Sequence, residues 1–160
     1  MNDWSNFFVA MAGAAAALAG LIFVGVSLNL AKVLSIPSLP DRALESLILL
    51  LNILIISALA LVPGQSMMAI GLEFLFIGAI TWSIMLYLDL RIWRNTNPGY
   101  KKHSRQNILF SQLAVLPYIL SGIMMLCQGT DGVYWLIPGV IISFIKAITD
   151  AWVLLVEIHR

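Results

Sequence analysis

The sequence predicts an all-α fold, a polytopic bundle of five transmembrane helices. Hydrophobic residues make up 61% of the chain and charged residues only 11%, whereas a soluble domain carries about 25% charged residues. So few charges cannot cover a water-facing surface, and the mean hydropathy of +0.95 agrees with a membrane protein. Five apolar segments follow one another in a single transmembrane domain over residues 1–160, at about residues 5–34, 41–63, 66–94, 106–128 and 133–158.

The first segment is the one against which we expect the other helices to pack. It has no charge between residue 7 and Lys32, and at ~1.5 Å per residue it is longer than the ~30 Å hydrocarbon layer. Small residues let membrane helices approach closely, and Gly13, Ala17 and Gly20 therefore predict helix packing. They belong to a small-residue stripe along one helix face: Asn6, Ala10, Gly13, Ala17, Gly20, Val24, Ser27 and Ala31. The stripe serves packing either within the chain or between copies in a homo-oligomer.

Breakers and polar stretches separate the later segments. Pro63 and Gly64 end the second helix, residues 95–99 end the third, and a basic loop follows at residues 100–105. Pro117 lies inside the fourth segment, where neighbouring helices can satisfy the carbonyl that it frees, so we expect a kink and not an end. Residues 129–132 predict a tight turn before the fifth segment.

The distribution of cations predicts the orientation, because Lys and Arg in short loops mark the cytoplasmic side. Five helices with the N-terminus outside and the C-terminus inside place eight of the nine cations in the cytoplasm: Lys32, Arg42, Arg91, Arg94, Lys101, Lys102, Arg105 and Arg160. Aromatic residues suited to the membrane interface agree, with Trp4, Tyr134 and Trp135 at the outer boundary and Trp93 and Tyr100 at the inner one. Only Lys146 remains inside the membrane.

The fifth segment carries a polar stripe on one helix face, formed by Gly139, Ser143, Lys146, Asp150 and Glu157. Lys146 lies ~20 Å along the helix from Val133, at a depth where a charge is costly. The stripe must therefore face protein or water. Three interpretations remain open, namely a structural ion pair between Lys146 and Asp150, a solvated pathway and a ligand site. Lys146 precedes the acid and leans away from it, which favours an additional partner on another helix.

Other polar residues extend this candidate charge network or polar pathway. Glu73 is either a functional intramembrane acid or an acid at headgroup level near its helix N-terminus. We expect Glu45, Asp89 and Arg91 to join Asp150 in a network near the inner boundary. Asn52 predicts a hydrogen bond across helices. The fourth segment has a milder polar face that we interpret as packing, with Asn107, Ser111, Tyr118, Ser121 and Gln128.

The motifs of common enzyme classes do not occur in the sequence. It lacks HExxH, G-x-S-x-G and a P-loop, and Cys127 is its only cysteine. We therefore expect no enzyme activity, no cofactor and no metal site. A formal net charge of +1 gives no reason to expect nucleic-acid binding.

The stretch AGAAAALAGLIFVGVSLNL, followed by LVPGQS, resembles a scattered set of small uncharacterised bacterial multi-span membrane proteins. The resemblance covers the first three helices. It implies a bacterial cytoplasmic (inner) membrane and no activity.

Two functions follow from the pattern. One is a small oligomeric channel or permease for ion transport, with a polar path along the fifth helix. The alternative is a non-conducting membrane scaffold or regulatory subunit, whose intramembrane charges are structural ion pairs. The expected partners are the lipid bilayer, further copies of the chain and, for a scaffold or regulatory subunit, another membrane protein.

Overall fold

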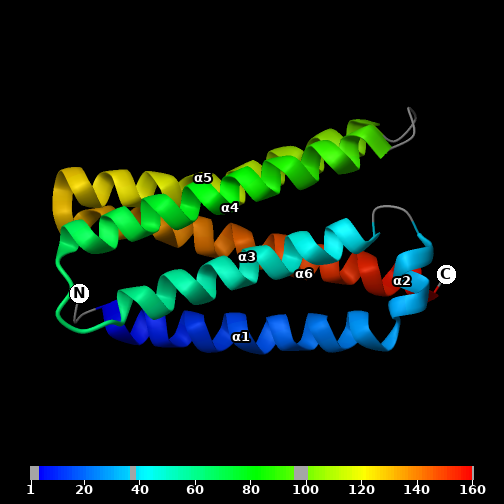
Figure 1. The fold of residues 1–160 in the computed structure, drawn as a ribbon, viewed down its shortest axis with the longest axis horizontal. Helices are drawn as coiled ribbons and strands as arrows, with labels where there is room; N and C mark the ends of the chain where they lie inside the picture. Colours follow the sequence, from blue (N-terminus) through cyan, green and yellow to red (C-terminus); the bar gives the residue numbers. More distant parts are fainter. Residues whose placement is uncertain (1–3, 37–38, 96–100, 160) are drawn as a thin grey trace.

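The computed structural model describes residues 4–36, 39–95 and 101–159, and these residues form a bundle of long helices (Figure 1). No strand occurs in the described ranges. The elements, in chain order, are α1 (Ser5–Leu28), α2 (Leu30–Ser35), α3 (Leu39–Ala60), α4 (Met67–Asn95), α5 (Lys101–Gln128), the 3-10 helix η3 (Gly129–Trp135) and α6 (Leu136–His159). The all-α fold is thus confirmed.

The first predicted helix is wrong in one respect, because it is interrupted at Asn29. The backbone of Asn29 lies outside the helical region (φ −118°, ψ 23°), and its N–H donates to Val26 O at 3.2 Å. The Asn29 side chain also donates to Gly25 O at 3.0 Å. Such local bonds compete with the helical ladder, and α2 turns away from the axis of α1 (Figure 1).

Two predicted loops are helical instead. Residues 101–105 form the start of α5, and the Lys and Arg residues among them are good helix formers. Residues 129–132 are part of η3, after Gly129 ends α5 with a left-handed backbone (φ 69°). Consequently α6 begins at Leu136, a little later than predicted, whereas α5 continues through Pro117 as expected. Most of the predicted break at residues 95–99 lies outside the described residues.

Among the described residues, four helical stretches are long and apolar enough to cross a membrane, one fewer than predicted: Ser5–Leu28, Leu39–Ala60, Met67–Arg94 and Ser104–Val156. The last stretch contains 53 residues and includes α5, η3 and α6. It is not straight, because the chain reverses at η3 and α6 runs back beside α5 (Figure 1). Many large apolar side chains remain exposed, such as Leu28 and Phe76, as a lipid-facing surface requires.

The central helix is α3, and the expectation that the others pack on the first helix is wrong. Helix α3 lies against α1, α4 and α6, whereas α1 packs mainly on α3 and buries only Phe8 and Ala15. The small-residue stripe of α1 is exposed along its length, and a Cβ added at Gly13 or Gly20 would meet nothing within 4 Å. The stripe therefore does not pack within the chain.

Glycines instead allow the close approach of α4 and α5. A Cβ added at Gly122 would lie 2.6 Å from the Leu75 backbone nitrogen and 2.9 Å from Gly71 O, while Gly78 faces the backbone of Ile119 at 3.1 Å. Backbone atoms cannot move aside as a flexible side chain can. This hairpin brings the polar residues of α4 and α5 within hydrogen-bonding distance of each other.

We predict that Gly122→Ala destabilises the folded protein, because the added methyl group collides with the α4 backbone. Overpacking of this kind costs about 1–3 kcal/mol. The measurement is the free energy of unfolding in detergent. Gly13→Ala is the matched control: it is also a helical glycine, but it faces open space, and we expect no loss of stability there. Equal stability of the two variants would contradict the close approach.

Candidate functional site: a buried charge network

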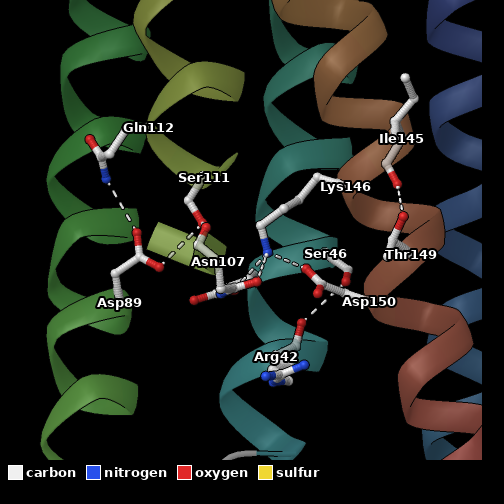
Figure 2. A network of polar contacts seen from close by, with 11 residues as sticks. Arg42, Ser46, Asp89, Asn107, Ser111, Gln112, Ile145, Lys146, Thr149 and Asp150 are labelled. Carbon is white, nitrogen blue, oxygen red and sulfur yellow. Dashed lines mark hydrogen bonds and ion pairs between the residues drawn. The ribbon is translucent and has the colours of Figure 1, made fainter. Parts of the chain in front are cut away.

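Lys146, on α6, is the centre of a charge network that is enclosed by protein. Its side chain is 2% exposed. The ammonium donates to Glu45 Oε2 at 3.1 Å and to Asn107 Oδ1 at 3.1 Å, and it forms a short bond to Asp150. An ammonium has three donors, so all three are used, on α3, α5 and α6 (Figure 2).

Both predicted kinds of partner for Lys146 are thus present. The pair with Asp150 is intrahelical at i, i+4, and the pair with Glu45 joins α6 to α3. Asn107 links these groups, because its Nδ2 donates to Glu45 Oε2 at 3.4 Å while its Oδ1 accepts from Lys146. Glu45 is fully buried, and its Oε1 has no hydrogen-bond partner in the described structure.

Asp89, on α4, forms the second part of the network. Ser111 Oγ lies 3.2 Å from Asp89 Oδ1, and Gln112 Nε2 donates to Asp89 Oδ2 at 3.2 Å. The Gln112 amide is held from the other side by Trp82, whose indole N–H donates to Gln112 Oε1 at 2.7 Å. Figure 2 shows Asn107 between Asp89 and Lys146, so α5 connects the two parts.

The N-terminal half of the polar stripe is buried in packing. Ser143 is buried and lies 3.0 Å from the Tyr118 hydroxyl, which donates to it, and 3.3 Å from Ala114 O, to which it donates. A Cβ added at Gly139 would come within 3.0 Å of Pro117. The stripe from Gly139 to Asp150 therefore faces protein. Glu157 lies in α6, but its side chain is outside the described residues.

Three further predicted residues lie apart from Lys146. Arg91 is about half exposed and pairs with Asp41 at 3.4 Å, so its expected place beside Asp150 is wrong. Glu73 lies in the N-terminal half of α4 and accepts from Gln65 at 2.8 Å. Asn52 makes the predicted bond across helices, accepting from Thr81 on α4 at 2.9 Å.

The sequence reasoning missed the role of α5. Asn107 and Ser111 were interpreted as packing residues and Gln112 was not singled out, yet all three contact the carboxyl groups of the network. The signal in the sequence is that residues 107–112 contain these three amide and hydroxyl side chains. On the predicted helices they lie at about the same depth as Asp89, counted from the basic residues at 100–105. Only the α4–α5 pairing shows that these residues and Asp89 meet.

Two apolar cavities of the described structure lie away from this network. One, of about 250 Å³, separates α1 from α6 and is lined by apolar side chains such as Leu18 and Leu21. Another, of about 520 Å³, lies over α5 and α6 around Leu120 and Pro138. Neither includes Lys146 or its partners. In the described ranges no group of three or more His, Cys, Asp or Glu side chains can hold a metal ion.

Comparison with protein-family models, curated proteins and solved structures finds no match for this chain.

We predict that Lys146→Met destabilises the protein by about 3–5 kcal/mol, because it leaves Glu45 and Asp150 buried without their cation. The triple variant Lys146→Met, Glu45→Gln, Asp150→Asn should recover much of this loss, since no charge is then stranded. The readout is the free energy of unfolding in detergent. Lys32→Met, which removes an exposed cation, is the control and should have little effect. A stable single variant, or a triple variant as weak as the single one, would contradict the buried network.

Proposed function

We propose that this protein is a non-conducting subunit of a bacterial inner membrane, crossing the membrane five times with the N-terminus outside and the C-terminus inside. It acts through contacts with further copies of itself or with another membrane protein. The observation that carries the proposal is the enclosed, paired state of Lys146, because a charge that is saturated by protein has no free donor for water or ions.

The arrangement of the helix ends supports five crossings. The start of α1 and the element η3 lie at one end of the bundle, and α2 lies at the other (Figure 1). Trp4 and Tyr134 meet at the first end with ring centroids 4.9 Å apart. Lys101 lies over the Trp93 ring at the opposite end, 5.9 Å from its centroid. Aromatic residues thus lie at both ends of the bundle and a basic residue lies at the second end, an arrangement typical of the two membrane interfaces.

We predict that reporter fusions at residue 98 and after Arg160 give cytoplasmic signals, and that a reporter inserted at Asp131 gives an external one. The reason is that the inner ends of all five crossings carry the Lys and Arg residues. A fusion at Gly64 serves as the second external control. A cytoplasmic signal from Asp131 would eliminate the fifth crossing and with it this topology.

The exposed face of α1 supports contacts between copies. Its small residues are exposed, and among the described residues a Cβ added at Gly13 or Gly20 would meet nothing within 4 Å. Membrane helices associate through faces on which backbones can approach closely. We infer a homo-oligomer that pairs through this face. The face lies opposite Phe8 and Ala15, so its occupation would not disturb the packing of α1 on α3.

We predict that the purified protein self-associates and that Gly20→Ile reduces its mass in detergent, because the larger side chain separates the paired backbones. The fold of each copy should be unaffected, since a Cβ added at Gly20 would meet nothing within 4 Å. Ala14→Ile, on an exposed flank of the same helix, is the matched control and should keep the mass of the wild type. An unchanged mass for Gly20→Ile would remove the pairing of copies through this face.

Ion flux through the protein would contradict the proposed non-conducting function. The wild-type protein in liposomes should pass protons, Na⁺ and K⁺ no faster than protein-free liposomes do. A proton permease is the second candidate, and it is favoured by two buried carboxyl groups that pair with the Lys146 ammonium, Glu45 and Asp150, and by a third in the same network, Asp89. Flux through the wild-type protein that is lost in Glu45→Gln, in a variant whose melting temperature stays close to that of the wild type, would decide for the permease.

A further inference from the structure

Asp89 is a fully buried acid that has no cation partner among the described residues. Its side chain is not accessible to solvent, and its two described hydrogen-bond partners, Ser111 and Gln112, are both neutral. The ammonium of Lys146 cannot serve Asp89, because its three donors are directed to Glu45, Asn107 and Asp150. A buried carboxylate in this position would be an unpaired charge, which proteins avoid by taking up a proton.

The Trp82–Gln112 contact determines which Asp89 oxygen stays free of a proton. An indole N–H only donates, so the Gln112 atom that faces Trp82 is its carbonyl oxygen. The Gln112 amide nitrogen therefore faces Asp89 and donates to Oδ2. Oδ2 acts as an acceptor, which leaves Oδ1 as the place for a proton.

Ser111 has the geometry to receive that proton's hydrogen bond. Its Oγ lies 3.1 Å from the Asn107 carbonyl oxygen and 3.2 Å from Asp89 Oδ1. A hydroxyl has one hydrogen to donate and lone pairs to accept with. When that hydrogen goes to the Asn107 carbonyl, the usual bond of a helical Ser, the contact with Asp89 requires a hydrogen on Oδ1.

We propose that Asp89 is a proton-binding site: the folded protein holds it as a neutral carboxylic acid at neutral pH, with the proton on Oδ1 and donated to Ser111 Oγ. The ligand is a single proton. The chain of hydrogen bonds runs from Asp89 Oδ1 to Ser111 and from Ser111 to the Asn107 carbonyl. This inference does not depend on whether the protein conducts.

The surrounding charges favour the neutral acid. From α3 the network contributes Glu45, and from α6 it contributes Asp150 and Lys146, which is a net charge of −1 when all three are ionised. The described network residues of α5 are uncharged. On α4 itself, Arg91 is about half exposed and is paired with Asp41. A proton on Asp89 avoids a second uncompensated negative charge.

The test is infrared spectroscopy of the purified protein in detergent at pH 7, as a difference between wild type and Asp89→Asn. An amide can replace a neutral acid here, with its oxygen accepting from Gln112 and its nitrogen donating to Ser111. The variant is therefore expected to fold with a melting temperature close to that of the wild type. The expected spectrum loses the C=O band of a neutral carboxyl group, a band that shifts in D₂O, and retains its carboxylate bands.

Asp131→Asn is the matched control, because Asp131 is an exposed acid of η3. That variant should lose carboxylate absorption and no neutral-carboxyl band. The proposal is overturned if Asp89→Asn also loses only carboxylate absorption. It is equally overturned if the neutral-carboxyl band persists in Asp89→Asn and disappears in Glu45→Gln, which would place the proton on Glu45.

A second measurement does not rely on band assignment. An Asp in the unfolded chain has released its proton above about pH 5, whereas the folded protein holds the Asp89 proton up to neutral pH. Unfolding therefore releases a proton in this range, so wild-type stability must fall as the pH rises. The melting temperature of the wild type should decrease relative to that of Asp89→Asn between about pH 5 and pH 7. Parallel melting curves across this range, or a relative increase for the wild type, would overturn the proposal.

Discussion

A buried ammonium needs acceptors for all three of its hydrogens, and this requirement governs how the helices of this protein meet around Lys146. Its acceptors are Glu45 on α3, Asn107 on α5 and Asp150 on α6. Removing any of these helices would leave a donor unsatisfied in a region where water is scarce. Burying the charge costs free energy, and the charge is tolerated only in the helix arrangement that pairs it. It therefore constrains how these helices pack.

The second constraint is the close approach of α4 and α5. Glycine at residues 71, 78 and 122 lets the two backbones come within contact distance, and this contact presents Ser111 and Gln112 to Asp89. The carboxyl group of Asp89 thus has neutral hydrogen-bond partners, while the ammonium of Lys146 on α6 is bound to other acceptors. The glycine contacts and the charge network are therefore linked, because the close approach of α4 and α5 decides which polar side chains lie next to the buried acid.

The periphery of the bundle has a different character from its centre. Helix α1 covers α3 with only two buried residues, and its small-residue stripe faces outward together with many large apolar side chains. An enclosed polar centre beside an open apolar exterior agrees with a protein that works through its surface in the membrane.

The sequence alone determined the all-α class, the apolar stretches and the charged residues of the interior, because hydropathy and helical periodicity depend only on composition and spacing. It placed Lys146 and Asp150 on one polar stripe and grouped Glu45, Asp89 and Arg91 with Asp150, since each is an ionisable residue within or near an apolar helix. It did not determine that α1 is peripheral or that Asn107 joins Glu45 to Lys146. Those features depend on which helix faces approach each other, and that is decided by packing between residues up to 101 positions apart.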